Sequence, residues 1–299
     1  MLGTAGGTES VKSVIGQIKE AEAFGLNNVW MANIFSFDAI SALGMAGLET
    51  STIELGTAVT PTYPRHPTAL AQQALTTAAA SGGRFILGVG LSHKIVIEGM
   101  LGLSYDRPAE HMREYLNVLM PLVRGEVCNF KGDQYSVAGL QIDIPGSDGM
   151  QVVVAALGPR MLKVAGELAD GTNTWMVGPQ TLEKHIGPRL TEAADSAGRP
   201  RPLVVAGFPI VLTNEPDQAR ERIAKQLVMY GQLPSYRAML DREGVAGPAD
   251  IAIVGDENMV GSEIRRLEDI GVTHFNAAIS GADSSEYKRT LEFLSDLAS

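Results

Sequence analysis

The residues best suited to bind a ligand lie in two glycine-containing turns, and each turn follows a short apolar run. In the first turn, "AALGPRML", Gly158 allows the backbone to approach a ligand closely and Pro159 suits the first position of a helix. The N–H groups of Arg160 and Met161 then point out of the start of that helix, where they and the Arg160 guanidinium can bind an anion. The turn therefore predicts an anion site, with an ordinary strand-to-helix turn and a solvated Arg160 as the alternative.

The second turn, "GVGLSHK", could also bind an anion. Gly88 and Gly90 permit close approach, and Ser92 with the backbone N–H groups after it can donate to a phosphate, with His93 beside them. The turn is not a dinucleotide-binding fingerprint, because the third glycine is missing and no acidic residue ends a strand about twenty positions later. We expect the two turns to lie side by side and to hold one ligand.

Other kinds of site are disfavoured. No two histidines have the spacing of metal ligands and no carboxylate-rich cluster appears, so we expect no metal site. No G-x-S-x-G motif appears, so a hydrolase nucleophile is not expected. His66 precedes a helix and is better suited to capping or packing than to catalysis, while His111, His185 and His274 are assigned structural positions. Cys128 has no clear partner and is expected to be inert.

Composition narrows the class of protein. The chain has 299 residues, of which 45% are hydrophobic, and its formal net charge is −10. There is no basic excess to bind nucleic acid or an acidic membrane surface, so a small molecule is the expected partner. No apolar run approaches the ~20 residues of a membrane helix, and no signal peptide is recognisable. A single cysteine fits a reducing compartment, so a soluble, cytoplasmic protein is expected.

The architecture follows from a repeated unit. "AEAFGLNNVWM", "TAAASGGRFILGVG", "AGELADGTNTWMV" and "LEDIGVTHFNAAI" each read as a helix end, one or two glycines and a strand. Helix, glycine and strand in succession are typical of parallel βα units. The sequence therefore predicts an α/β fold, a (β/α)8 TIM barrel with insertion segments forming one domain over residues 1–299. An open doubly wound sheet is the alternative.

The expected elements can be placed by residue number. Strands are expected at a stub, Leu2–Gly3, and at Asn28–Met31, Ile53–Val59, Phe85–Val89, Val152–Ala155, Thr172–Met176, Leu203–Leu212, Ile251–Val254 and His274–Ile279. Helices are expected at Glu9–Phe24, Phe37–Glu49, Pro67–Ala80, Pro108–Arg124, Pro159–Ala169, Gln180–Ala197, Pro216–Met229, Met259–Ile270 and Ser284–Leu297. Two segments, at about 127–147 and 229–250, are additional to the repeated helix, glycine and strand unit. The first is expected to form a hairpin with a Gly132-Asp133 turn, and insertions of this kind commonly form lids or interfaces.

Two stretches carry a family resemblance. "LGTAVTPTYPRHPTALAQQALTTAAASGGRFILGVGLSH" and "AALGPRMLKVAGELADGTNTW" resemble the luciferase-like (bacterial-luciferase-type) oxidoreductase superfamily. They are most similar to its F420-dependent actinobacterial branch, which includes the methylenetetrahydromethanopterin reductase-like enzymes. The resemblance runs from about Val11 to Leu294. It implies a barrel with an insertion, a homodimer, and coenzyme F420 lying across the strand ends, with FMN as the alternative cofactor.

The resemblance also implies which residues bind the cofactor. Ala58 and Val59 match the position of a non-proline cis peptide bond that backs the ring system in relatives. The remaining positions match two phosphate-side loops and a segment close to them: Gly90, Leu91, Ser92, His93, Ala155, Ala156, Leu157, Gly158, Met176, Val177 and Gly178. The end of the stub strand, Gly3 to Ala5, is also expected to line the cofactor.

One departure from the family affects the expected chemistry. Several relatives carry an acidic residue or a histidine after the second strand, whereas this chain has Asn33, which can hydrogen-bond but is a poor acid or base. Hydride transfer from reduced deazaflavin to an activated C=C or C=N bond therefore fits better than alcohol oxidation, with the proton from water or a tyrosine. The aromatic residues expected in the substrate pocket, each of which could instead be ordinary packing, are Phe35, Tyr63, Trp175, Phe208 and Tyr236. An FMN-dependent monooxygenase and a non-catalytic barrel that binds a flavin-like ligand are the alternatives.

Overall fold

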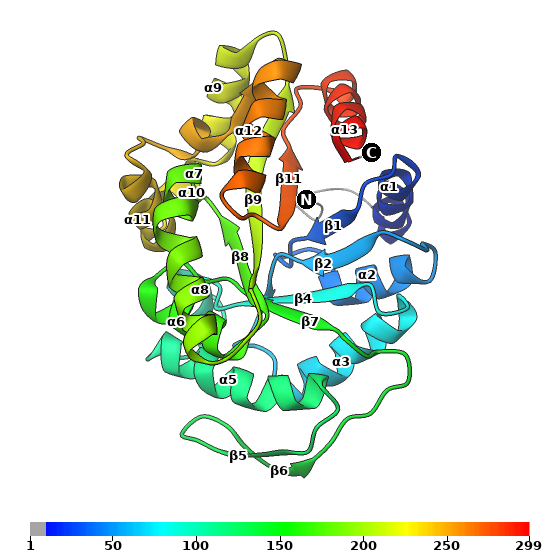
Figure 1. Cartoon of the computed structure of the whole chain (residues 1–299), viewed down its shortest axis with the longest axis vertical. Coiled ribbons are helices and arrows are strands. Elements are labelled where there is room, and N and C mark those ends of the chain that lie inside the picture. Colours follow the sequence, from blue (N-terminus) through cyan, green and yellow to red (C-terminus); the bar gives the residue numbers. More distant parts are fainter. Residues whose placement is uncertain (1–9, 299) are drawn as a thin grey trace.

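The computed structural model describes residues 10–298, in which parallel strands form an almost closed barrel inside a layer of helices (Figure 1). The strands of the nine-stranded sheet are β1 (Asn28–Met31), β2 (Glu54–Thr57), β3 (Thr60–Pro61), β4 (Phe85–Gly90), β7 (Gln151–Val154), β8 (Gly171–Trp175), β9 (Leu203–Leu212), β10 (Ile253–Gly255) and β11 (His274–Ile279). The order along the sheet is β1-β2-β4-β7-β8-β9, and β11 continues it by pairing with β9. The predicted barrel is confirmed.

The two ends of this sheet approach each other inside the barrel. Trp30 of β1 and His274 of β11 make an edge-on ring contact with centroids 6.1 Å apart, and the Nε2 of His274 lies 3.2 Å from a carboxylate oxygen of Glu54 on β2. The stub strand Leu2–Gly3 and the ligand-lining positions Gly3 to Ala5 lie outside the described residues.

Strand β9 is longer than its neighbours, and this changes the expected strand order. Its residue Ile210 pairs with Ile279 of β11 on one edge and with Ile253 of β10 on the other. Strand β8 covers only Leu203 to Gly207 of β9, so β10 occupies the edge that β8 leaves free. The barrel thus continues from β9 to β11, and β10 is a short branch. It begins two residues later than predicted because Pro248–Ile251 forms a 3-10 turn.

Side chains alternate between the two faces of the barrel, as the two-residue period of a strand requires. The outward residues Val29, Leu55, Leu87, Val154 and Phe208 join the core shared with the helices. The inward residues Trp30, Ile86, Val153 and Val205 form a separate cluster. Towards the carboxyl ends of the strands the inward positions become small, at Gly88, Gly90, Ala155 and Gly207.

The helices cover the outside of the barrel (Figure 1). They are α1 (Val11–Ala23), α2 (Ala39–Gly47), α3 (Pro67–Ala80), α4 (Lys94–Ile97), α5 (Pro108–Val123), α6 (Pro159–Leu168), α7 (Pro179–Thr181), η1 (Leu182–Ile186), α8 (Gly187–Ser196), α9 (Pro216–Gln226), α10 (Val228–Gln232), α11 (Pro234–Glu243), η2 (Pro248–Ile251), α12 (Glu257–Asp269) and α13 (Ser284–Ala298). Left-handed Gly25 and Gly271 follow the ends of α1 and α12, where the chain must reverse into a strand.

The two insertions occupy different places. The first is an antiparallel hairpin, β5 (Cys128–Lys131) and β6 (Ser136–Leu140), and its turn is fixed by Glu114 of α5, which accepts hydrogen bonds from three backbone N–H groups of the turn. The second comprises α10 and α11, which lie near α7 in Figure 1. Only the second contacts the carboxyl end of β8, through the cluster that Met176 forms with Leu240 of α11.

Candidate active site at the carboxyl ends of the strands

A bulge between β2 and β3 forms one wall of the site. The Ala58–Val59 peptide bond is cis, at the position where the family resemblance led us to expect it. Val59 packs so closely on β4 that a Cβ at Gly90 would overlap its Cγ2 atom and would lie 3.1 Å from the Cβ of Ala155. Gly90 is therefore needed for this packing, and Ala58, Val59 and Ala155 remain partly accessible above it.

The exit of β4 presents Leu91, Ser92 and His93, which are all partly exposed. Ser92 has a left-handed backbone, with a φ of 59°, and its carbonyl accepts a hydrogen bond of 3.2 Å from the hydroxyl of Tyr105. His93 begins α4 without capping it, and its ring meets that of Tyr236 at 5.3 Å. Burial lowers the pKa of His93. Among the five histidines it alone has no side-chain hydrogen bond within residues 10–298.

The exit of β7 leaves backbone donors free. Gly158 is the N-cap of α6 and offers no capping side chain, and a Cβ there would meet nothing within 4 Å. Within the described chain the N–H groups of Gly158, Arg160 and Met161 have no hydrogen-bond partner. At the starts of α2 and α3, in contrast, Asp38 and His66 accept hydrogen bonds from backbone N–H groups, and His66 thus has the capping role expected of it. The β7 exit can therefore receive an anion.

At the exit of β8, in contrast, the residues are buried and backbone N–H groups already have a hydrogen-bond partner. Met176, Val177 and Gly178 are buried, and Met176 packs under the insertion with Leu240. The carboxylate of Glu243, at the end of α11, accepts hydrogen bonds from the N–H groups of Gln180 at 3.0 Å and Thr181 at 2.7 Å. A Cβ at Gly178 would overlap this carboxylate, so a glycine is needed here to leave room for Glu243. Sequence patterns had no signal for this contact, because its partners are more than sixty residues apart.

Aromatic side chains connect the strand exits. The ring of Tyr63, after β3, stacks on Tyr105 at 5.3 Å, and Tyr230 of the insertion contacts both Tyr236 at 5.8 Å and Trp175 of β8 at 6.3 Å. Tyr63 also stacks on His111, which bonds Thr62 at 3.0 Å and Gln134 at 2.8 Å. Of the predicted pocket residues, the structure links Trp175 and Tyr236 through Tyr230 and places Tyr63 with Tyr105 in a separate group of rings. It adds Tyr105 and Tyr230, which sequence reasoning did not select.

Of the two other predicted pocket residues, Phe208 lies elsewhere. Phe208 is fully buried on the outward face of β9 and meets Phe275 at 6.3 Å, so it packs under the helices and does not line the barrel interior. Phe35 is 64% exposed in the segment after β1. Asn33 is partly exposed in the same segment, and its side-chain oxygen accepts a hydrogen bond of 3.0 Å from the backbone N–H of Ala39. Its amide N–H₂ group remains available to a ligand.

Burial controls the acidity of the tyrosines at the site. Burial raises the pKa values of Tyr63, Tyr105, Tyr230 and Tyr236, and neighbouring tyrosines add to the effect at Tyr63 and Tyr236. These hydroxyl groups stay protonated at neutral pH. They can donate hydrogen bonds to a bound molecule but do not act there as anions.

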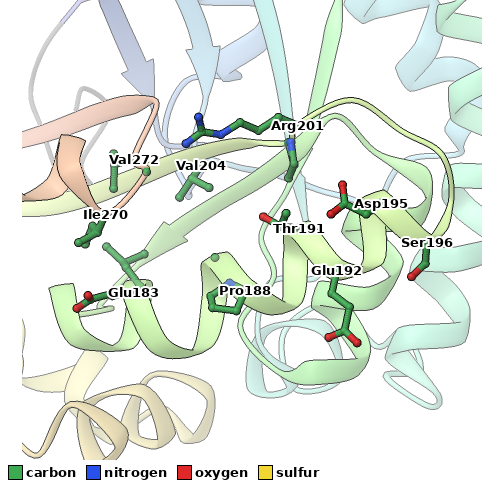
Figure 2. A pocket seen from close by; sticks show the side chains of 14 residues that line it. Glu183, Pro188, Thr191, Glu192, Asp195, Ser196, Arg201, Val204, Ile270 and Val272 are labelled. Carbon is green, nitrogen blue, oxygen red and sulfur yellow. The ribbon is translucent and has the colours of Figure 1, made fainter.

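A surface pocket lies at the other end of the barrel. Its volume is about 580 Å³, and it adjoins the amino ends of β9 and β11. Figure 2 shows Arg201, Glu183, Pro188 and Val204 among the side chains around it. None of the predicted ligand residues lines it. In residues 10–298 no cluster of histidine, cysteine and acidic side chains is arranged to hold a metal, and no helix there has the length and apolar character needed to cross a membrane.

Comparisons with known proteins agree with this geometry. The family model of luciferase-like monooxygenases matches residues 1–274. The 5,10-methylenetetrahydromethanopterin reductase of Methanolobus tindarius is 29% identical over 249 residues, which cover 82% of this chain and 75% of the relative. The corresponding reductase of Archaeoglobus fulgidus is 29% identical over 243 residues, covering 79% of this chain and 71% of the relative.

Solved structures show the same fold. The coenzyme F420-dependent tetrahydromethanopterin reductase of Methanopyrus kandleri superposes with a TM-score of 0.79 at 25% identity, covering 96% of this chain and 94% of the other. An F420-dependent secondary alcohol dehydrogenase, solved with an F420–acetone adduct, gives a TM-score of 0.80 at 21% identity, with coverage of 96% and 94%. With the family model matching most of its length, the chain belongs to the luciferase-like monooxygenase family.

Proposed function

We propose that this oxidoreductase uses coenzyme F420 and transfers a hydride between the reduced deazaflavin and a small organic substrate with an activated C=C or C=N bond. Membership of the luciferase-like family makes the protein an oxidoreductase. The F420-dependent relatives support the choice of cofactor, and the absence of a titratable group at Asn33 supports the choice of substrate bond.

One observation carries the cofactor proposal. The exits of β4 and β7 are neighbours, since Gly88 pairs with Val153, and the bulge at Val59 lies beside them. Because Gly90 lets Val59 pack close to β4, the partly accessible residues Ala58, Val59 and Ala155 form a surface against which a planar ring can lie. The free N–H groups of Gly158 and the start of α6 suit the phosphate of the cofactor. These residues fit the group.

The protein's own residues would mainly bind and orient the reactants. When bound, reduced F420 supplies the hydride. The amide N–H₂ of Asn33 would donate a hydrogen bond to a ring carbonyl or a substrate oxygen, because its carbonyl is already held by Ala39. The aromatic side chains of Tyr63, Trp175 and Tyr236 would exclude water from the substrate.

Reduction of the substrate also requires a proton. We assign its delivery to His93, because this imidazole makes no hydrogen bond within the described chain and faces Tyr236 at the strand exits. Partial burial lowers the pKa of His93, so its protonated imidazole is a stronger acid than that of a fully solvated histidine. Lys94 and Glu98 pair with each other at 3.6 Å, which leaves His93 without a fixed partner charge.

Titration of the purified protein with F420 and separately with FMN, followed by ligand fluorescence, tests the proposal. Micromolar binding of F420 with much weaker binding of FMN is the expected result, together with substrate reduction that consumes no oxygen. Preference for FMN with oxygen consumption would instead identify a monooxygenase, and binding of neither would remove the cofactor assignment. We further propose a cytoplasmic homodimer, and sedimentation of the protein tests the dimer.

A further inference from the structure

His185 is a buried histidine that the chemistry above does not use. It lies on the π-helical turn η1, inside the helical segment 179–196, and only 2% of its surface is exposed. Its Nε2 lies 2.8 Å from the carbonyl oxygen of Leu157 at the β7 exit. A carbonyl can only accept, so Nε2 carries the proton. Burial lowers the pKa of His185 and outweighs the hydrogen bond to Leu157, which acts to raise it. Arg242 and Arg189 lower the pKa further, so the ring is neutral and has this one tautomer.

This position is not explained by packing alone. In the neutral ring Nδ1 is an acceptor, and it is buried without a hydrogen-bond partner. An unpaired buried nitrogen costs free energy that an aromatic hydrocarbon of similar size, such as phenylalanine, would avoid. The benefit of a histidine here is therefore the single hydrogen bond to Leu157. The π-helical turn shifts the register of the segment that carries His185, and such turns are frequent at functional sites.

The hydrogen bond fixes the orientation of a peptide group in the proposed phosphate site. In a trans peptide the C=O of Leu157 and the N–H of Gly158 point in opposite directions. With the carbonyl directed at His185, the Gly158 N–H is directed away from η1. The space beside the Cα of Gly158 is open, because a Cβ there would meet nothing within 4 Å. Leu157 O accepts no other hydrogen bond within the described residues.

We propose that His185 is a positioning residue that holds the Leu157–Gly158 peptide so that the Gly158 N–H, with those of Arg160 and Met161, faces the cofactor's phosphate. The inference rests on the proposed function, since it concerns the same site. It predicts that His185 contributes to binding only when the ligand carries the phosphate. A contribution to folding alone would affect every ligand of the ring pocket alike.

The test compares two ligands and three proteins by fluorescence titration. The ligands are F420 and its phosphate-free 8-hydroxy-5-deazariboflavin chromophore, and the proteins are wild type, His185→Phe and His185→Gln. Wild type is expected to prefer F420. His185→Phe is expected to reduce that preference about tenfold while binding the chromophore as before. His185→Gln, whose amide N–H can reach the same carbonyl, is expected to restore the preference to within about threefold.

The outcomes separate the inference from the proposed function. If wild type binds F420 and prefers it to the chromophore, but His185→Phe keeps the full preference, the role of His185 is wrong and the cofactor assignment stands. A loss of both ligands in His185→Phe with an unchanged melting temperature also contradicts the inference. If wild type binds neither deazaflavin but binds FMN, the F420 assignment fails. The role of His185 is then tested by comparing the binding of FMN with that of riboflavin, which lacks the phosphate.

Discussion

The carboxylate of Glu243 accepts a hydrogen bond of 2.7 Å from the backbone N–H of Thr181, and this contact ties the insertion to the helix that follows β8. The same insertion helix, α11, carries Tyr236 to the ring of His93. The helix that receives Glu243 continues into η1, where His185 contacts the β7 exit. The insertion and the proposed phosphate site are thus attached to the same helical segment.

The contact between Gly178 and Glu243 can be tested by a double substitution. Gly178→Ala forces a Cβ against the carboxylate and is expected to destabilise the fold by about 1–3 kcal/mol, as overpacking does. In Gly178→Ala combined with Glu243→Ala the loss should be less than the sum of the single losses, because the clash is removed. Urea unfolding measures the loss of stability in each single variant and in the double variant. Gly187→Ala, on the same helical segment with its nearest contact at 3.3 Å, is the matched control, and strict additivity would contradict the contact.

Gly90→Ala should weaken cofactor binding. Its Cβ would push against Val59 and Ala155, which form the proposed wall behind the ring. We expect at least about a tenfold loss of F420 affinity, equivalent to ~1.4 kcal/mol. Fluorescence titration measures it, with Gly16→Ala on the exposed face of α1 as the control. An unchanged affinity would place the ring elsewhere.

His93→Gln should change the pH dependence of substrate reduction. Because burial lowers the pKa of His93 below 6.5, the donor is protonated at low pH, and kcat should fall as pH rises through the lowered pKa. The variant should lose this fall and about 100-fold in kcat, within the usual contribution of a general acid. His66→Asn, at the α3 N-cap, is the control. A pH profile that survives in His93→Gln would assign the proton to another donor.

Glu22 links α1 to the segment before β2 and should make stability depend on pH. Burial acts to raise its pKa, but hydrogen bonds from the N–H groups of Thr52, Ile53 and Ser51 outweigh that effect and lower it from 4.5 to about 2. The stabilisation is present above pH 4.5 and is lost as pH falls towards 2. Because these hydrogen bonds are largely exposed and screened by solvent, Glu22→Gln should cost about 0.5–1 kcal/mol at pH 7 and less near pH 2. Urea unfolding at both pH values checks this, and a constant difference, or one equal to that of Glu20→Gln, would contradict it.

Local sequence signals predicted most of the barrel. The strands at Asn28–Met31, Leu203–Leu212 and His274–Ile279 have the predicted bounds, because glycine ends the preceding helix or apolar runs define the strand. The strand predicted over Ile53–Val59 is shorter in the structure: β2 ends at Thr57, before the cis bond at Ala58–Val59 that periodicity does not encode, and β3 begins only at Thr60.

The parts that were missed depend on contacts between distant residues. Phe208 was assigned to the pocket by residue type, but Val205 and Gly207 take the inward positions of β9, so Phe208 must face outward. The roles of Glu243 and His185 depend on partners far away in sequence, Thr181 and Leu157, which no local pattern reveals.

The measurement that tests the account most directly is the F420 affinity of Gly158→Trp compared with that of wild type and of Gly16→Trp. Both glycines have open space around them, so neither substitution should prevent folding, but only the first fills the proposed phosphate site. The account predicts micromolar F420 binding by wild type and Gly16→Trp and its loss in Gly158→Trp. Equal affinity in all three proteins would show that the cofactor does not lie across the exits of β4 and β7.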